Sequence, residues 1–75
     1  MQRKHVYSAQ ALRERDEIIE RIRDAMKHME YTQNELSREL GMKTQSLNQR
    51  LTGKHEFRLI ELIELCDLLG IEIII

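Results

Sequence analysis

The sequence predicts a mainly α-helical domain of four or five helices that ends in a short β-strand. Three observations lead to this fold class. The 75 residues include no proline and only three glycines, which stand at the ends of periodic apolar segments, where helices terminate. Leucine, isoleucine and methionine recur at helical spacing over most of the chain. The last five residues, IEIII, are instead β-branched and alternating, which is typical of a strand.

The composition limits the chain to one small domain with an aliphatic core. Seventy-five residues leave no room for a second domain, and the chain has no tryptophan and a single phenylalanine. Its only cysteine, Cys66, cannot form an intramolecular disulfide, which fits the reducing cytoplasm. The sequence contains neither an apolar run long enough to span a membrane nor a signal peptide, so we expect a cytoplasmic protein with no membrane partner.

The first helix is expected to follow a flexible basic arm, residues 1–7. Ser8 is a suitable N-cap for one long or slightly broken helix that runs towards Met29; alternatively, Asp16 caps a shorter helix. The inward stripe of this helix has helical spacing and comprises Leu12, Ile18, Ile19, Ile22, Ala25, Met26 and Met29.

Residues 33–51 are predicted to form a helix-turn-helix. Thr32 and Glu35 have the spacing of a capping box, in which each side chain accepts a hydrogen bond from the backbone N–H of the other residue. Gly41 supplies the left-handed conformation that ends the first helix, and a second helix follows over residues 44–51. Two helices of about eight residues are not stable alone, so they must belong to one compact unit in which the second helix exposes a polar face.

A fourth helix is expected over residues 59–69 and a strand over residues 71–75. The inward stripe of the helix comprises Leu59, Leu62, Ile63, Cys66 and Leu69, and its solvent face comprises Glu61, Glu64 and Asp67. The strand has no partner in its own chain, so the economical arrangement pairs it antiparallel with the same strand of a second copy. Ile71, Ile73 and Ile75 would then form a dimer interface; alternatively, the tail folds back over the helices as an irregular cap.

The charged residues are unevenly distributed, although the net charge is only −1. Residues 32–54 carry four basic and two acidic side chains, whereas residues 55–75 carry one basic and five acidic side chains. A side that faces DNA and a side that faces solvent would produce this division, and so would ordinary solvated charge.

No combination of residues indicates an enzyme. His5, His28 and His55 are far apart and have no metal-ligand spacing, and the chain lacks a glycine-rich phosphate-binding loop. Cys66 falls on the apolar stripe of its helix, so we expect it in the core rather than at an active site. We therefore expect a non-enzyme that needs no cofactor and no metal.

From Ile18 to Ile71 the chain resembles the Cro/repressor-type helix-turn-helix family of phage and bacterial regulators. The residues that carry the resemblance stand at the family's spacing without gaps: Thr32, Gln33, Glu35, Leu36, Gly41, Gln45, Ser46, Leu47, Gln49, Gly53, Lys54, Leu68, Leu69, Gly70 and Ile71. The resemblance implies a compact repressor-type bundle of four or five helices. It also implies that a C-terminal strand, which some short members of the family add, takes part in dimerisation.

The family reads DNA with the second helix of the motif, and the resemblance transfers its contacts to named positions of this chain. The base-contacting positions are Lys43, Thr44, Gln45 and Gln49. Glutamine can donate to and accept from adenine at once, lysine can donate to guanine, and threonine can form a hydrogen bond or pack its methyl group against thymine. Gln33 matches a family position that contacts a phosphate, and Ser46, Asn48, Lys54 and His55 are further candidates for phosphate contacts. The N-terminal arm either has no function or places Arg3 or Lys4 in the minor groove.

Three positions depart from the family's pattern. Lys43 stands where the recognition helix usually begins with a Ser or Thr cap, so the cap either moves to Thr44 or is weaker. Arg50 replaces a large apolar residue; either it lays its stem along the core and pairs with an acidic neighbour, or the local packing differs. Ser37 replaces an alanine where the two helices approach closely, and it is small enough to fit.

These observations predict a sequence-specific transcriptional regulator, phage-like or from a mobile element, that binds a double-stranded DNA operator as a small homodimer. The alternative is a protein-binding modulator, an antirepressor or antitoxin, that docks on another repressor or on a toxin. A basic stripe continuous with Gln45 and Gln49 would favour DNA, and an apolar patch across them would favour the protein partner.

Overall fold

The computed structural model describes residues 6–72, which form four α-helices. They are α1 (Ala9–His28), α2 (Gln33–Leu40), α3 (Thr44–Leu51) and α4 (Leu59–Leu69). The predicted mainly α-helical bundle is therefore confirmed. Of the predicted strand, Ile71 and Glu72 are not in a strand, and Ile73 and Ile75 lie outside the described residues, as do Arg3 and Lys4 of the basic arm.

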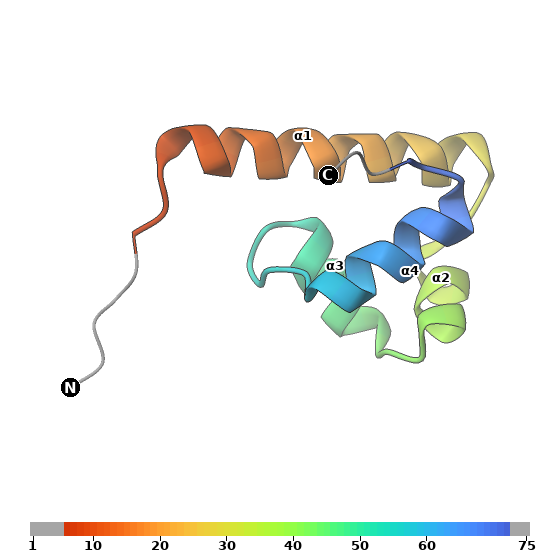
Figure 1. Ribbon diagram of the computed structural model, residues 1–75. Coiled ribbons are helices and arrows are strands. Elements are labelled where there is room, and N and C mark those ends of the chain that lie inside the picture. Colours follow the sequence, from red (N-terminus) through yellow and green to blue (C-terminus); the bar gives the residue numbers. More distant parts are fainter. Residues whose placement is uncertain (1–5, 73–75) are drawn as a thin grey trace.

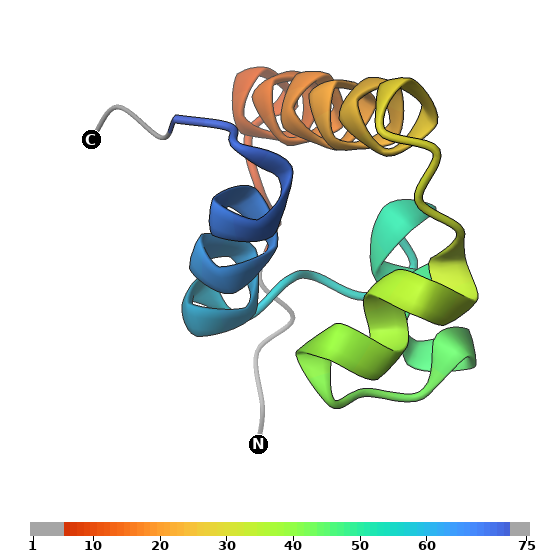
Figure 2. The same ribbon diagram turned by 90° about the vertical axis from the view of Figure 1, so that its right-hand side faces the viewer.

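The four helices pack around one aliphatic core, with α1 along one side of the other three (Figure 1). Figure 2 shows α4 and the α2–α3 pair on opposite sides beneath α1. The buried core comprises Ile22, Met26, Leu36, Leu47, Leu51, Leu65 and Leu69, so every helix contributes to it. Among the described residues, none of the helices combines the length and apolar character that a membrane span requires.

Helix α1 is one continuous helix that begins at the predicted N-cap. The Ser8 hydroxyl accepts a hydrogen bond from the N–H of Ala11 at 3.0 Å, and the helix continues past Asp16 without a break. Its buried residues are Ile19, Ile22 and Met26. Ile18 and Met29, which we placed on the inward stripe, are 43% and 47% exposed, so the buried stripe is narrower than the sequence predicts.

The turn between α1 and α2 depends on a residue other than glycine with a left-handed backbone. Glu30 has φ = 58°, and this conformation lets the N–H of Tyr31 donate to the carbonyl of Met26 at 2.8 Å. A side chain in this region costs roughly 1–2 kcal/mol, so the contacts that follow the turn must offset it.

The buried face of α4 overlaps only in part with the one that the spacing predicts. Leu65, Cys66 and Leu69 are buried, whereas Leu59 is 67% exposed, so the prediction that Leu59 faces the core is wrong. Leu59 is the first residue of α4 and lies at the end of the helix, beyond the core. The buried position of Cys66 is confirmed, and burial raises the pKa of its thiol.

Arg50 of α3 and Glu61 of α4 form an ion pair, which is the first of the two alternatives that the sequence left open for Arg50. The Arg50 Nε donates to the Glu61 carboxylate at 2.8 Å, and Arg50 Nη1 donates to the carbonyl of Ser46 at 3.0 Å. Only 19% of the Arg50 side chain and 16% of the Glu61 side chain are exposed. The prediction that Glu61 faces solvent is therefore wrong, because the carboxylate turns towards Arg50.

The same carboxylate closes the start of α4. Glu61 accepts a hydrogen bond from the N–H of Arg58, the N-cap residue, at 2.9 Å. Burial by itself would raise the pKa of Glu61, but the hydrogen bonds from Arg58 and Arg50 outweigh it and hold the pKa below its usual value. The ionised form of Glu61 therefore stabilises the contact between α3 and α4.

This arrangement predicts a specific loss of stability in acid. Because the folded pKa of Glu61 lies below the unfolded value of about 4.3, its contribution is present above that pH and is lost as the pH falls through the folded pKa. We expect Glu61→Gln to be less stable than wild type at neutral pH and to lose less stability on acidification, measured by urea unfolding at several pH values. Glu64→Gln, on the exposed side of α4, controls for the change in net charge. Parallel pH profiles for wild type and Glu61→Gln would contradict the assignment.

Candidate nucleic-acid interface

The first helix of the motif begins with the predicted capping box. The Thr32 hydroxyl accepts a hydrogen bond from the N–H of Glu35 at 3.1 Å, and the Glu35 carboxylate accepts one from the N–H of Thr32 at 3.0 Å. The hydrogen bond from the Thr32 N–H is the main cause that lowers the pKa of Glu35. Within the described residues, the backbone N–H groups of Gln33 and Asn34 form no hydrogen bond, so they remain available at the positive end of α2.

The turn from α2 to α3 requires glycine at its first position. Gly41 has φ = 68°, and its N–H donates to the carbonyl of Arg38 at 3.2 Å. The N–H of Met42 donates to the carbonyl of Ser37 at 2.9 Å. A Cβ atom at Gly41 would contact nothing within 4 Å, so backbone conformation and not space selects glycine here. The turn therefore fixes the direction in which α3 leaves α2.

Side chains at the N-terminal end of α3 are hydrogen-bonded to α2. The Thr44 hydroxyl donates to Oδ1 of Asn34 at 2.9 Å and lies 3.0 Å from the hydroxyl of Ser37. Ser37 is 3% exposed and donates to the carbonyl of Asn34 at 2.9 Å, which confirms that a serine fits at this close approach. Lys43 is the N-cap residue of α3 and makes no capping hydrogen bond with its side chain. The cap is therefore weaker and has not moved to Thr44, whose hydroxyl bonds to α2 instead.

The C-terminal end of α3 is fully capped. Its last four carbonyl groups each accept a hydrogen bond. They belong to Asn48, Gln49, Arg50 and Leu51, and their donors belong to Thr52, Lys54, Gly53 and Arg23, respectively. The guanidinium of Arg23 reaches from α1 and lies 2.9 Å from the Leu51 carbonyl, where a positive charge also complements the helix dipole.

The predicted contact residues are distributed over α2, the turn before α3, α3 itself and the turn after it. The exposed ones are Lys43, Thr44, Gln45, Asn48, Lys54 and His55, and the half-buried ones are Gln33, Ser46 and Gln49. Asn48 donates from Nδ2 to Oε1 of Gln33 at 3.2 Å, which links a predicted phosphate contact on α3 to one on α2. Lys43 and Gln45 make no side-chain hydrogen bond with any other described residue, so their polar groups are available to a ligand.

Sequence reasoning missed three residues that shape this surface or hold the loop beside it. Asn34 stands beside Gln33 in the first turn of α2, and this position could have indicated that it belongs to the same surface. Arg23 gave no signal, because its contact with the end of α3 depends on how α1 crosses the motif. Arg15 of α1 likewise reaches the loop after α3, where it donates to Glu56 at 2.6 Å.

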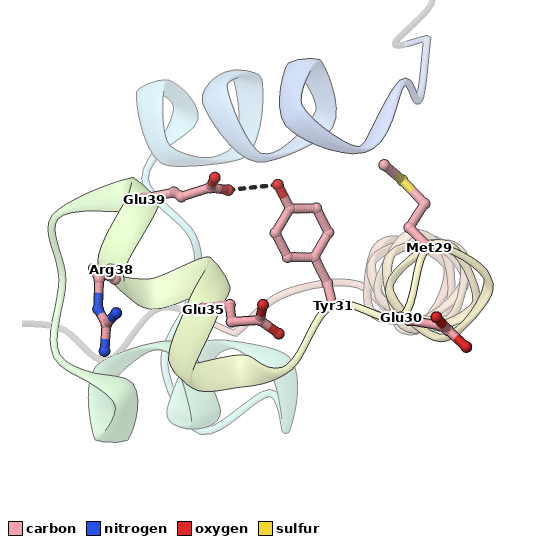
Figure 3. Close-up of a pocket in the computed structure, with 6 residues that line it drawn as sticks. All are labelled: Met29, Glu30, Tyr31, Glu35, Arg38 and Glu39. Atoms are coloured by element: carbon pink, nitrogen blue, oxygen red, sulfur yellow. Dashed lines mark hydrogen bonds between the residues drawn. The ribbon is translucent and has the colours of Figure 1, made fainter.

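A polar hollow between the end of α1 and α2 has the wrong charge for DNA. It is lined by Met29, Glu30, Tyr31, Glu35, Arg38 and Glu39 (Figure 3). Tyr31 donates its hydroxyl to Glu39 at 2.6 Å, and this hydrogen bond raises the pKa of Tyr31. The carboxylates of the hollow would repel a phosphate backbone.

Within residues 6–72, no three or more histidine, cysteine, aspartate or glutamate side chains are grouped as a metal site would require.

A protein-family model described as helix-turn-helix matches residues 22–74, a segment that includes α2, the turn and α3. No curated protein and no solved structure matches the chain. The family match covers most of the sequence, and the capping box, the glycine turn and the buried contact of α2 with α3 lie inside it. The chain belongs to the Cro/repressor-type helix-turn-helix family of DNA-binding regulators.

Proposed function

We propose that this regulator reads a specific operator with α3 in the major groove. The observation that carries the proposal is a short helix held at both ends by hydrogen bonds, with polar side chains on its free face. Lys43, Gln45 and Gln49 supply the donors and acceptors that base edges require. The Thr44 hydroxyl is engaged with Asn34, so its contribution to base recognition is a methyl contact with thymine.

The phosphate contacts proposed for this interface lie on α3 and on the segments before and after it. Gln33 lies at the positive end of α2, and its side chain is held by Asn48. Lys54 lies in the turn after α3, where its N–H donates to the carbonyl of Gln49 at 2.9 Å. Ser46 and Asn48 complete the set on α3. These contacts position the helix, and the base contacts select the sequence.

Nothing on α3 supports the alternative that this face docks on a repressor or a toxin. The large apolar side chains that are exposed within residues 6–72 are Val6, Tyr7, Ile18, Met29, Leu59 and Ile60. All of them lie on α1, on α4 or next to α1. A protein-docking face on α3 would need apolar surface there.

We further propose that the regulator binds DNA as a homodimer formed through its C-terminal tail. Ile71 packs against the core and borders an apolar groove between α1 and α4, which is also lined by Ile18, Ile22, Leu62 and Cys66. Pairing of two tails would bury Ile73 and Ile75 in the dimer interface. A two-fold pair would place two copies of α3 about 34 Å apart, one turn of DNA.

The first test is selection from random duplex DNA at low salt. We expect one sequence motif to be enriched, and affinity for it to fall by orders of magnitude between about 50 and 200 mM salt, because phosphate contacts release counterions. If no motif is enriched at low salt, the proposed function is wrong.

Base and phosphate contacts should respond differently to substitution. Gln45→Ala or Gln49→Ala should cost on the order of 1–3 kcal/mol on the selected site and relax base preference locally. Lys54→Ala should weaken binding to all duplexes alike and reduce the salt dependence. Binding of each variant to the selected and to a scrambled duplex separates the two patterns, and thermal unfolding should hardly change. Equal losses on both duplexes for Gln45→Ala would contradict a base contact.

The role of the C-terminal tail in dimerisation can be tested with changes that leave the core intact. Deleting residues 73–75, or making Ile73→Glu, keeps Ile71 and its N–H, which donates to the carbonyl of Cys66 at 2.8 Å. Either change should give a folded monomer that binds the operator far more weakly, because each buried isoleucine contributes roughly 1.5–3 kcal/mol. Sedimentation measures the oligomeric state. Val6→Glu, at an 85% exposed apolar residue, is the control. A wild-type protein that is monomeric and still binds a half-site tightly would contradict the proposed dimer.

A further inference from the structure

Two side-chain amides at the start of α2 have their oxygen atoms occupied by donors from α3. The Thr44 hydroxyl donates to Oδ1 of Asn34 at 2.9 Å, and Nδ2 of Asn48 donates to Oε1 of Gln33 at 3.2 Å. An amide offers one acceptor oxygen and one NH₂ group with two donors. Both oxygens accept from α3, and the NH₂ groups of Gln33 and Asn34 donate to no other described residue, so these NH₂ groups are the donors open to a ligand.

The location of these NH₂ groups favours an anion. Gln33 and Asn34 are the first two residues of α2, where the backbone N–H groups and the helix dipole are positive. The capping box uses the N–H of Glu35, one residue further along, and leaves those of Gln33 and Asn34 at the open end. Asn34 is exposed. Backbone and side-chain donors therefore meet at one point beside α3.

We propose that Asn34 donates from Nδ2 to a DNA phosphate next to Gln33, and that Thr44 is the positioning residue that holds the Asn34 amide in this orientation. The proposal rests on the proposed function, because it adds a backbone contact to the same interface. It also separates two roles of Thr44: the hydroxyl orients Asn34, and the methyl group remains free to touch DNA.

The network around Thr44 explains why its hydroxyl is not available to a base. Ser37 is 3% exposed, donates to the carbonyl of Asn34 and lies 3.0 Å from the Thr44 hydroxyl. Turning the Thr44 hydroxyl towards DNA would break its hydrogen bond to Asn34 and leave this polar contact incomplete between the two helices.

Variants of Asn34 separate the donor from the acceptor. Asn34→Asp keeps an oxygen for the Thr44 hydroxyl and suits the first turn of a helix, but it removes both N–H donors and adds a negative charge. We expect it to lower affinity at least tenfold on the selected duplex and on a scrambled duplex alike. Asn34→Ala should lower both affinities about tenfold, as expected for a hydrogen bond to a charged group. Gln10→Glu, an exposed amide on α1, is the charge-matched control and should bind like wild type.

Variants of Thr44 test the positioning role. Thr44→Val removes the hydroxyl and keeps a methyl group, so it should weaken binding several-fold without changing the preferred sequence. It should cause no further loss in the Asn34→Ala background, and Thr44→Ser should retain most of the affinity. A purely structural role of Thr44 would not produce this dependence on Asn34. Thermal unfolding of each variant shows that the fold is intact.

The outcomes that overturn the inference are distinct from those that overturn the function. If wild type selects a motif but Asn34→Ala and Asn34→Asp bind like wild type, Asn34 makes no contact. If Gln10→Glu weakens binding as much as Asn34→Asp, the loss is a general effect of charge. If Thr44→Val changes the preferred base at one position and its loss adds to that of Asn34→Ala, the Thr44 hydroxyl reads a base. If wild type selects no motif, the proposed function itself fails.

Discussion

The candidate interface depends on holding an eight-residue helix in a fixed direction. A helix as short as α3 is not stable by itself in water, so its conformation comes from contacts with the rest of the domain. Leu47 and Leu51 are fully buried and attach its inner side to the core, Thr44 ties its beginning to α2, and Arg23 of α1 caps its end. Each of the other elements therefore contributes to presenting α3.

The contact between α3 and α4 shows how an ion pair can fix the relative orientation of two helices. The attraction between Arg50 and Glu61 is offset in large part by the cost of removing both charges from water, so the pair adds little net stability compared with apolar packing. Its geometry is more restrictive than apolar packing would be. Arg50 donates both to Glu61 and to the carbonyl of Ser46 on its own helix, and Glu61 also accepts from the start of α4. The end of α3 and the start of α4 are thus held in a fixed position relative to each other.

The parts of the fold that depend on local chemistry could be predicted from the sequence. The Ser8 cap, the capping box of Thr32 and the left-handed Gly41 are each encoded within about one helical turn, and all are present. Features that depend on other parts of the chain, or that no residue type marks, could not be predicted in the same way. The left-handed Glu30 has no glycine to reveal it, and the exposure of Leu59 depends on where the core ends. The hydrogen bonds of Asn34 with Thr44 and of Arg23 with Leu51 depend on how α2 and α1 cross α3.

The electrostatics of the motif are modest, and this has a consequence for the proposed mode of binding. Residues 32–54 carry four basic and two acidic side chains, and Arg50 is already paired with Glu61. Each domain has few charges left to neutralise phosphates, so a single domain should bind random DNA weakly, and the steep salt dependence expected for the operator would come from the charges of two domains together. The proposed contacts from neutral donors, Gln33 and Asn34, would add directional hydrogen bonds that release no counterions. A single domain of this kind reads few bases, and joining two of them makes the second binding event intramolecular. In the proposed dimer, weak charge and a two-fold arrangement would act together: the first would limit binding to random sequences, and the second would restore affinity only where two half-sites have the right spacing.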